Sequence, residues 1–577
     1  MGLYYVSINT GSDSNKGSES DPFKTIGHAS NVCKPGDTIL IHPGIYRERI
    51  TPNKSGYKKL PITYKSMVKH GTIVRGSIPW KGDFEKNGII EGSLDQTLFT
   101  DKSHKNGSNP FLIHLSVTPY GREGLPESKI KSIGPEKSDP NMIYCLGQVF
   151  VDDEMFKQCP YKHEMEKTIK SWFYDSKVNK LYINGASLDQ EIEITNQRRL
   201  LAPHKRGLKN IIIDGFIFER CGNQYPNKFW SRENNQQAGA VGTRCGKYWT
   251  IKNNVIRYAN GIGIDWGNEG RYKEDLEYGN NGKAFGSYGN KIIDNIICDN
   301  GAAGTAAYYA NKFEFFGNTV KRNNNLHFSG KQRWESAGLK IHHPKNSIIS
   351  NNIIDDNYCH GIWSDQGSGK DSYFQNNIIL NNKGNGIEFE IGKNSSGKVI
   401  NNIFNNNEYG IRFSDSGGAL IANNLFIKSR LADIKTLMYK REKDKWDSLN
   451  VEIYYNTFLK SEQFLHLTPN KNKIGFLSSR YLNFNTYFMN PDEKKFQMKY
   501  SWKKIKNLNF NEWKEITQND LGGNIPKDSD DYYSNFISNN KNISIRYESN
   551  KLFIIGDEYL VNYFKEHQIK KSFQNNF

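Results

Sequence analysis

Four short segments between Gly338 and Ser414 place acidic, basic and aromatic residues at equivalent positions. Each starts with glycine and an apolar residue, and the starting glycines lie 23, 25 and 24 residues apart. Within each segment apolar and polar residues alternate, which is typical of a strand with one buried side. The segments read Gly338-Leu339-Lys340-Ile341-His342, Gly361-Ile362-Trp363-Ser364-Asp365, Gly386-Ile387-Glu388-Phe389-Glu390 and Gly410-Ile411-Arg412-Phe413-Ser414. If they stack in register, their third residues form one outward column and their fifth residues form another.

The fifth-position column brings two carboxyl groups onto neighbouring strands. It reads His342, Asp365, Glu390 and Ser414. Because neighbouring strands lie about 4.8 Å apart, we expect the carboxyls of Asp365 and Glu390 to lie about 5 Å apart. Enzymes that cleave glycosidic bonds with retention of configuration place two carboxyls about 5–5.5 Å apart, whereas inverting enzymes leave a wider gap for water. The register therefore predicts a double-displacement mechanism, if the substrate is a glycoside.

The surroundings of the two carboxyls predict different roles. His342 precedes Asp365 by one coil and Lys340 lies on the diagonal, so the ionised form of Asp365 is favoured. Glu390 lies against Asp365 and Glu388 and should hold its proton longer. Asp365 is thus the expected nucleophile and Glu390 the expected acid/base.

The third-position column supplies expected substrate-binding residues. It reads Lys340, Trp363, Glu388 and Arg412, and His342 of the fifth-position column joins this set. Charged groups can bind sugar hydroxyls, and an aromatic ring can pack against a sugar face. A simpler alternative is a solvated ladder on an outer surface, in which Glu388 and Arg412 form an exposed ion pair.

Earlier segments are expected to extend the same groove. Tyr308 of Gly304-Thr305-Ala306-Ala307-Tyr308 and Asp265 of Gly261-Ile262-Gly263-Ile264-Asp265 would continue the fifth-position column. Trp334 and Glu335 come just before their strand and after an expanded turn, so both could reach over the site. These four residues complete the predicted substrate-binding set.

A repeat of asparagines predicts the fold that positions these residues. Asparagines followed by apolar or Thr/apolar pairs recur at Asn254, Asn295, Asn318, Asn352, Asn377, Asn402, Asn424, Asn456 and Asn485. Their intervals of 22 to 41 residues are typical of a solenoid with inserted loops. Helical repeats are excluded by the short β-rich units, and the leucine spacing of leucine-rich repeats is missing. We therefore predict an all-β, right-handed parallel β-helix with an Asn ladder at one turn.

Changes of pattern predict four regions. Residues 1–80 should form an N-terminal cap and the first coils, with a helix from Asp21 to Val32 that has Asp21 as N-cap and Pro22 at its first position. Residues 81–205 lose the Asn rhythm and should form an inserted β-sandwich-like domain. Residues 206–486 should form the catalytic β-helix, and 487–577 a C-terminal extension or cap. An alternative for this last region is glycan binding through Trp502, Trp513, Tyr532 and Tyr533.

Composition narrows the partners. The net charge of +17 suggests an anionic partner, but no dense basic run or DNA-binding motif is present, so we expect a carbohydrate rather than a nucleic acid. The sequence contains no run of about 18 apolar residues, so we predict no membrane span. The seven cysteines show no CxxC pair or zinc spacing, and no DxDxDG loop indicates Ca²⁺, so no cofactor or metal is expected, although β-helix enzymes can bind Ca²⁺ without such a loop. No signal peptide is expected; compartment and oligomeric state stay open.

Several motifs resemble the β-xylosidases of glycoside hydrolase family 120 over roughly residues 4 to 430. They are Asp21-Pro22-Phe23, Gly36-Asp37-Thr38-Ile39, Gly44-Ile45-Tyr46-Arg47-Glu48, Gly147-Gln148-Val149-Phe150, Gly361-Ile362-Trp363-Ser364-Asp365 and Glu388-Phe389-Glu390-Ile391. The resemblance implies a parallel β-helix interrupted by a β-sandwich, and a retaining mechanism with Asp365 as nucleophile and Glu390 as acid/base. Glu335 and His342 match substrate-binding positions. The chain departs from the family at Trp334 and at Gln366-Gly367, which flank the sugar, so uronic or sulfated sugars stay open beside xylose.

Two other classes of function fit the same residues. In a polysaccharide lyase or C5-epimerase, Lys340, His342 or Arg412 would neutralise a uronate and abstract its C5 proton. In a non-catalytic, glycan-binding β-helix, Asp365→Asn and Glu390→Gln would leave every measurable property unchanged. The expected enzyme remains a retaining hydrolase of an oligo- or polysaccharide.

Overall fold

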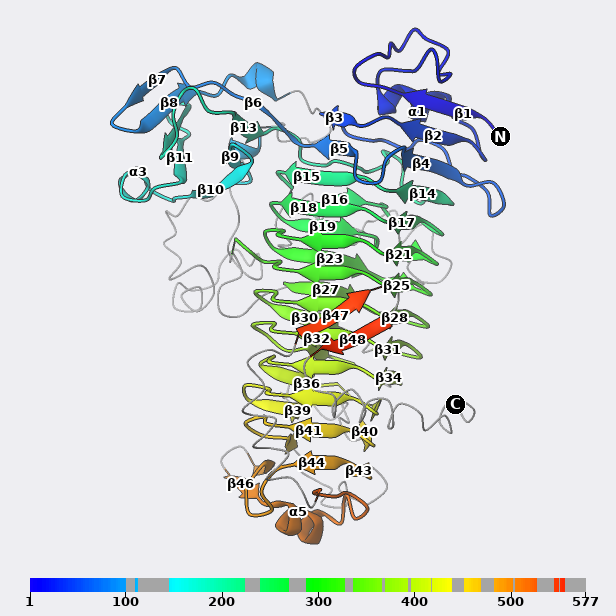
Figure 1. Cartoon of the computed structure of the whole chain (residues 1–577), viewed down its shortest axis with the longest axis vertical. Helices are drawn as coiled ribbons and strands as arrows, with labels where there is room; N and C mark the ends of the chain where they lie inside the picture. The colour runs from blue at the N-terminus through cyan, green and yellow to red at the C-terminus, as the bar shows by residue number, and fades with distance from the viewer. Residues whose placement is uncertain are drawn as a thin grey trace. The chain divides into compact units, whose positions relative to one another are not determined.

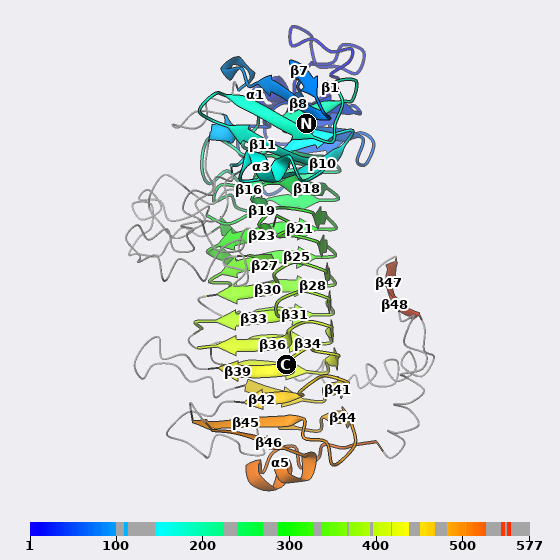
Figure 2. The same cartoon turned by 90° about the vertical axis from the view of Figure 1, so that its left-hand side faces the viewer.

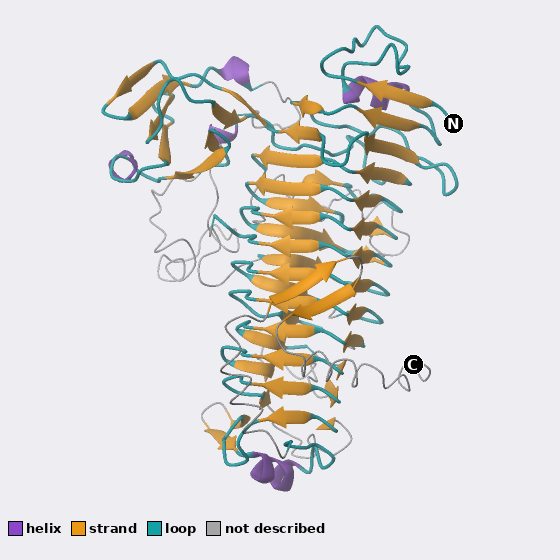
Figure 3. Cartoon of the chain, viewed as in Figure 1, coloured by secondary structure: helices purple, strands orange, loops and turns teal. Residues whose placement is uncertain are grey.

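The chain is an all-β protein built on a right-handed parallel β-helix, as the asparagine repeat predicted. The structure is a computed structural model, and Figure 3 shows how strongly strands dominate it. It describes residues 1–99, 109–112, 145–223, 239–268, 287–326, 336–365, 369–392, 396–416, 418–437, 451–467, 482–501, 504–526, 544–548 and 551–555. The chain divides into two compact units: Met1–Ala310 with Thr319–Lys340, and Asn311–Asn318 with Ile341–Phe577.

The first unit contains coils whose short parallel strands line up in three sheets (Figure 1). The first sheet includes β1 (Leu3–Val6), β2 (Thr38–Ile41), β4 (Ile62–Ser66), β14 (Ile211–Asp214), β17 (Thr250–Lys252) and β21 (Lys291–Ile293). The second includes β3 (Gly44–Tyr46), β5 (Thr72–Arg75), β15 (Ile217–Cys221), β18 (Val255–Ala259), β22 (Ile296–Cys298) and β26 (Thr319–Lys321). The third includes β16 (Gly239–Gly242), β19 (Ile262–Asp265) and β23 (Ala303–Tyr308).

A two-sheet module interrupts these coils between β5 and β14. Its strands, in spatial order, are β6 (Ser77–Pro79), β13 (Ile192–Thr195), β9 (Val149–Val151), β10 (Glu154–Gln158), β11 (Ser171–Asp175), β12 (Lys180–Asn184), β8 (Ile89–Ser93) and β7 (Phe84–Lys86). The first half of β10 pairs with β9 and its second half with β11, so this strand passes from one sheet to the other. Side chains of both sheets, among them Val149, Ile194, Trp172 and Leu181, share one buried core, as in a β-sandwich. Short helices α3 (Lys162–Met165), η1 (Gln96–Leu98) and η2 (Pro110–Leu112) accompany it.

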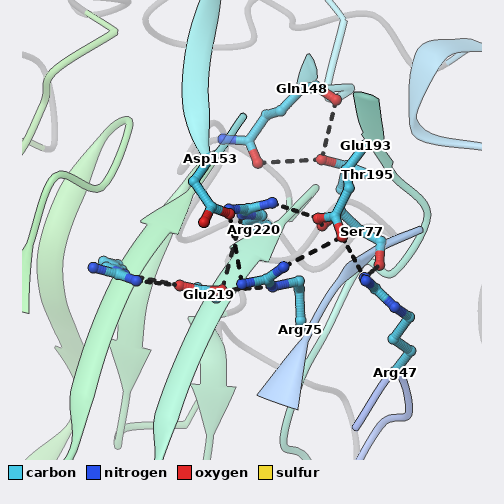
Figure 4. Close-up of polar contacts among 10 residues, drawn as sticks. Arg47, Arg75, Ser77, Gln148, Asp153, Glu193, Thr195, Glu219 and Arg220 are labelled. Atoms are coloured by element: carbon cyan, nitrogen blue, oxygen red, sulfur yellow. Dashed lines mark hydrogen bonds and ion pairs between the residues drawn. The ribbon is translucent and has the colours of Figure 1, made fainter. Parts of the chain in front are cut away.

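A cluster of buried ions holds the module to the coils of the first unit (Figure 4). Glu193 of β13 accepts a hydrogen bond from Ser77 (2.6 Å) and pairs with Arg47, Arg75 and Arg220, which lie after β3, on β5 and on β15. Burial would raise the pKa of Glu193, but the Ser77 and Arg47 hydrogen bonds and the charges of Arg47 and Arg220 outweigh it and lower this pKa to about 2. Glu193 therefore stays ionised at any physiological pH.

A second carboxylate completes this ion cluster. Glu219 on β15 is fully buried and lies 2.7 Å from Arg75 and 2.7 Å from Arg257 of β18. The more exposed Asp153 pairs with Arg220. Three carboxylates, Asp153, Glu193 and Glu219, thus face four arginines in this cluster.

The N-terminal helix is shorter than predicted. Helix α1 spans Ile26–Val32 and its N-cap is Thr25, whose side chain accepts from the His28 N–H. Asp21 and Pro22 lie outside it because Phe23 already pairs with the backbone of β1, at Tyr5 and Ser7. The predicted start at Asp21 is wrong because this long-range pairing overrides a favourable local capping sequence.

The second unit continues the three-sheet pattern. Its first sheet includes β25 (Glu314–Phe316), β28 (Ile348–Ser350), β31 (Tyr373–Gln375), β34 (Gly397–Ile400), β37 (Ala419–Ala422), β40 (Val451–Tyr454) and β43 (Leu482–Asn483). Its second includes β29 (Ile353–Asp355), β32 (Ile378–Leu380), β35 (Ile403–Asn405), β38 (Leu425–Ile427), β41 (Thr457–Leu459) and β44 (Thr486–Phe488). Its third includes β30 (His360–Asp365), β33 (Ile387–Glu390), β36 (Tyr409–Ser414), β39 (Ala432–Leu437), β42 (Leu465–Leu467), β45 (Phe496–Ser501) and β46 (Lys504–Leu508).

The remaining elements are short. Strand β27 (Ala337–His342) has its first four residues in the first unit and its last two in the second. Strands β20 (Ser287–Tyr288), β24 (Ala310–Asn311), β47 (Ser544–Glu548) and β48 (Lys551–Ile555) and helix α5 (Phe510–Thr517) complete the description. Within the described part of the chain, every helix is too short or too polar to cross a membrane.

The predicted Asn ladder is present in both units. Asn254 donates to Asn295 in the first unit, and in the second unit the bonds run coil by coil from Asn318 to Asn485. At each step both the backbone N–H and the side-chain amide donate to the next Asn Oδ1. Asn376 and Asn401, each preceding a ladder Asn, have φ of 55° and 58°. The recurrent Asn-Asn pairs therefore combine a left-handed turn residue with a ladder residue.

A helical cap closes the last coil of the second unit. Asn485 donates to the carboxylate of Asp520, which also accepts from the hydroxyl of Tyr487. Helix α5 starts with a capping box between Asn509 and Glu512. Its Trp513 is fully buried against the ring of Phe496, so this indole packs in the core and offers no surface for a glycan. Trp502, Tyr532 and Tyr533 lie outside the described residues.

Candidate active site

The site strands have the register that the sequence predicted. Strand β30 pairs with β33 so that Trp363 faces Glu388 and Asp365 faces Glu390. Strand β33 pairs with β36 so that Glu388 faces Arg412, and Glu390 faces Ser414. Figure 2 shows these strands stacked one above the other in the third sheet. Asp365 and Glu390 are therefore cross-strand partners, about 4.8 Å apart along the stack.

The carboxyl side chains on β30 and β33 are buried, unlike the side chain of Ile348 on the first sheet. Exposure is 5% for Asp365, 3% for Glu388 and 9% for Glu390, whereas Ile348 of β28 is 42% exposed. Isolated carboxylates are rarely buried, because leaving water disfavours their charged form. The alternative of a solvated surface ladder is therefore wrong for these residues.

Asp365 has a histidine from the preceding coil beside it. The Nε2 atom of His342 lies 3.6 Å from Oδ2 of Asp365, and His342 is itself 1% exposed. The backbone N–H of His343 donates to the carbonyl of Asp365, which fixes the two coils together. If protonated, the His342 ring would place a positive charge beside the Asp365 carboxyl.

Glu390 is held by the indole of Trp363. Nε1 of Trp363 donates to Oε2 of Glu390 across 3.1 Å, and the edge of the His360 ring packs against the same indole, with centroids 5.1 Å apart. This bond links the third residue of one coil with the fifth residue of the next.

Glu388 is the carboxyl in this group with a clearly perturbed titration. Burial raises its pKa to about 7; the charge of Arg412 opposes the rise and the charge of Glu390 adds to it. Asn385 donates to Oε2 of Glu388 (2.5 Å), and Nε of Arg412 lies 3.8 Å from the same oxygen. Glu388 lies on β33 two residues before Glu390, and its raised pKa brings its titration close to neutral pH.

Family models match two parts of the chain. Residues 238–426 match a family described as "Right handed beta helix region", and residues 9–87 match "Protein of unknown function (DUF1565)". The "Uncharacterized protein YwoF" of Bacillus subtilis (strain 168) is 35% identical over 81 residues, which cover 14% of this chain and only 17% of that protein.

Solved structures share the fold at low sequence identity. The complex of XylC with xylose aligns over 87% of this chain and 86% of its own, with 18% identity and a TM-score of 0.62. The GH136 lacto-N-biosidase from Eubacterium ramulus aligns over 80% of this chain and 67% of its own, with 15% identity and a TM-score of 0.42. The XylC alignment shows a shared architecture across most of both chains. Membership of glycoside hydrolase family 120 stays a prediction.

The predicted place of Asp265 is wrong. Strand β19 pairs with β23 so that Asp265 faces Ala306 and not Tyr308, which lies two residues further on. A shift of two residues keeps every side chain on its own face, so alternation in the glycine- and alanine-rich run Gly301–Gly304 could not reveal it. Asp265 is fully buried and accepts from the N–H of Gly267 (2.8 Å), while Tyr308 packs in an apolar cluster with Ile262.

Three other predicted substrate-binding residues stay predictions. Trp334 and Glu335 lie outside the described residues. Lys340 is fully buried on β27 and belongs to the first unit. The structure of the second unit thus brings together His342, Trp363, Asp365, Glu388, Glu390 and Arg412.

The sequence analysis missed Asn385 and His360, which flank the glycine-led segments. Asn385 donates its side-chain amide to Glu388 and its backbone N–H to Nδ1 of His360 (3.0 Å). The signal was present, because Asn385 immediately precedes Gly386 and His360 immediately precedes Gly361. No described group of three or more His, Cys, Asp or Glu side chains has an arrangement that could hold a metal ion.

Proposed function

We propose that this protein is a retaining glycoside hydrolase of an oligo- or polysaccharide, with Asp365 as nucleophile and Glu390 as acid/base. The observation that carries the proposal is the pairing of Asp365 with Glu390 on adjacent strands. Adjacent strands support a carboxyl separation close to the 5–5.5 Å of retaining enzymes rather than the wider gap of inverting ones. Burial of both carboxyls supports chemistry in a site that excludes most water.

The environments of the two carboxyls support their separate roles. In the first step a carboxylate oxygen of Asp365 bonds to the anomeric carbon while the bond to the leaving oxygen breaks, and that oxygen takes the proton of Glu390. In the second step Glu390 removes a proton from water, whose oxygen bonds to the anomeric carbon and releases Asp365. A protonated His342 would favour the charged nucleophile, and the indole N–H of Trp363 orients Glu390.

The test is to trap and assign the covalent intermediate. Because the fold is shared with XylC, which was solved with xylose, an aryl β-xyloside and its 2-fluoro analogue are the first probes, followed by other aryl glycosides. We expect retention of configuration in the first product, labelling of Asp365, and loss of at least about 10³-fold in kcat for Asp365→Asn and Glu390→Gln. Inversion of configuration would contradict the proposal, as would turnover unchanged by both substitutions.

A lyase or epimerase would leave a different signature. Elimination gives an unsaturated product that absorbs in the ultraviolet, and epimerisation exchanges the C5 hydrogen with solvent. Either result on a uronate polymer, without hydrolysis of any glycoside, would replace the proposed reaction. A purely glycan-binding protein would bind sugar equally well before and after substitution of Asp365, with no turnover.

A further inference from the structure

The third-position column changes from acidic to basic after Glu388. From β30 to β39 its registered members are Trp363, Glu388, Arg412 and Lys435, and His466 of β42 follows. The sequence analysis ended this column at Arg412. The structure therefore adds a second cation, directly opposite the first on the neighbouring strand.

Two like charges in this position are unfavourable by themselves. Cross-strand partners with the same charge destabilise a sheet, and here Arg412 and Lys435 are such partners. Tyr409, the first residue of β36, offsets this in part: Nζ of Lys435 donates to its hydroxyl (3.0 Å) and lies 4.9 Å from its ring centre, and the guanidinium of Arg412 lies 5.9 Å from the same ring. Glu388, on the other side of Arg412, lies 3.8 Å from its Nε, and an anion bound by both Arg412 and Lys435 would add to this compensation.

The two cations are also more accessible than the carboxyls above them. The side chain of Arg412 is 21% exposed against 4% for Glu388, and Lys435 is likewise partly exposed. By strand spacing, Lys435 lies two strands, or about 10 Å, from the strand that carries Glu390. That distance suits a substituent on a neighbouring sugar better than one on the sugar being cleaved.

We propose that Arg412, Lys435 and Tyr409 form a subsite for an anionic substituent, a carboxylate or a sulfate, on a sugar adjacent to the Asp365–Glu390 pair. This inference rests on the proposed function and specifies its substrate class. Arg412 can bind both oxygens of a carboxylate or sulfate through its planar fork, Lys435 adds a point charge, and the Tyr409 ring holds both in place.

A second lysine in the same unit serves as a matched control. Lys398 of β34 donates to the hydroxyl of Tyr373 (3.0 Å) and lies 4.8 Å from its ring centre, which reproduces the Lys435–Tyr409 geometry on the first sheet. Its registered neighbours are Tyr373 and Leu420, however, and not a second cation. A Lys–Tyr pair alone therefore does not make the anion subsite.

The experiment measures binding in the Asp365→Asn protein, so that turnover plays no part. Calorimetry compares neutral xylo-oligosaccharides with the same oligosaccharides bearing one glucuronate, and then oligogalacturonides and sulfated oligosaccharides with their neutral counterparts. We expect at least one charged member to bind about tenfold tighter than its neutral partner, and Lys435→Gln or Arg412→Gln to abolish that preference. The carboxylate and sulfate arms identify the source of the anion.

The remaining outcomes decide against the inference. Equal binding of charged and neutral partners throughout would overturn it, as would an equal loss in Lys398→Gln. Thermal unfolding of each variant separates loss of the subsite from loss of the fold. Binding is measured without hydrolysis, so the two proposals can fail separately. A preference for the charged oligosaccharide without any glycosidase activity would contradict the proposed reaction alone. Hydrolysis of neutral glycosides without such a preference would contradict the subsite alone.

Discussion

Two buried clusters of charged side chains differ in how many cations meet each carboxyl. In the first unit Glu193 meets Arg47, Arg75 and Arg220, and its pKa is lowered to about 2. In the second unit Glu388 meets one arginine, at 3.8 Å, and an amide, and burial raises its pKa to about 7. The hydrogen bonds from Ser77 and Arg47 and the charges of Arg47 and Arg220 outweigh burial at Glu193, whereas at Glu388 burial outweighs the charge of the single arginine.

The direction of the pKa shift distinguishes a carboxylate that holds two parts of the fold together from one that could exchange a proton. A carboxylate that stays ionised at every working pH can bind strand β13 of the inserted module to the coils, but it cannot exchange a proton. Glu388, which has one arginine at 3.8 Å, has its pKa raised to about 7, and a carboxyl that titrates in the physiological range is typical of sites that move protons. The excess of acid around Asp365, Glu388 and Glu390 is therefore the stronger indication of function, and the ion cluster around Glu193 indicates structure.

The largest expected effect breaks the ion cluster of the first unit. Glu193→Gln removes the carboxylate paired with Arg47 and one of those paired with Arg75 and with Arg220, and should lower the free energy of unfolding by about 3–5 kcal/mol. The control is Glu154→Gln, which breaks the 2.7 Å pair with Lys170, whose side chains are 54% and 57% exposed, and should cost at most about 1 kcal/mol. Denaturant titration measures both; equal losses would mean that the buried cluster contributes no more than a surface pair.

The next largest effect is on the pH dependence of stability, to which Glu193 and Glu388 contribute in opposite directions. The lowered pKa of Glu193 contributes stability that is present above its unfolded value of about 4.5 and is lost as pH falls toward 2. The raised pKa of Glu388 contributes stability that is present below about 4.5 and is lost as pH rises toward 7, by up to about 3 kcal/mol. Glu388→Gln should therefore stabilise the protein at pH 8 and leave it nearly unchanged at pH 4.

Unfolding free energies at several pH values test this contrast. The Glu388→Gln profile should have a smaller slope between pH 4.5 and 7, where Asp520, whose pKa burial raises to about 6, still titrates, and it should keep the slope below pH 4.5 that Glu193 contributes. A Glu388→Gln protein with the original slope between pH 4.5 and 7 would show that another group titrates there.

The smallest expected effect concerns the bond between Trp363 and Glu390. Trp363→Phe keeps a ring but removes the indole N–H, so kcat on a glycoside should fall about 10- to 100-fold and the acid/base limb of the pH–rate profile should shift. The control is Trp172→Phe in the inserted module, where the lost bond goes to the Phe156 carbonyl (3.1 Å). That variant should lose stability without a shift of the profile; a shift in both would exclude a specific role for Trp363.

Sequence reasoning was most successful where equal spacing and strict alternation coincide. Gly361, Gly386 and Gly410 start segments 25 and 24 residues apart, and the register of β30, β33 and β36 is as predicted. It failed at Asp265, where a shift of two residues leaves the same face outward. Alternation determines the face of a strand but not its position along the neighbour.

Burial and titration could not be predicted from the pattern. Glu388 and Arg412 read equally well as a solvated ion pair, and only the three-dimensional surroundings show that the carboxyl is buried. Lys435 was missed for a related reason: Asp433 replaces the leading glycine of that coil, so the segment Ala432–Thr436 no longer matches the repeat. Residues whose role depends on neighbouring coils are the ones that a linear motif overlooks.

The Asn ladder has a direction, and its last acceptor limits assembly. Each Asn passes its amide hydrogens to the following coil, but Asp520 accepts from Asn485 as a carboxylate and has no amide hydrogen to pass on. Helix α5 then packs where a further coil would stack. A chain that ends between Asn485 and Asn509 would lack this cap, so the strands of its last coil would have exposed edges and the amide of Asn485 would lack its acceptor. Exposed strand edges can pair with those of other copies and form fibres. The cap therefore keeps a potentially endless stack finite.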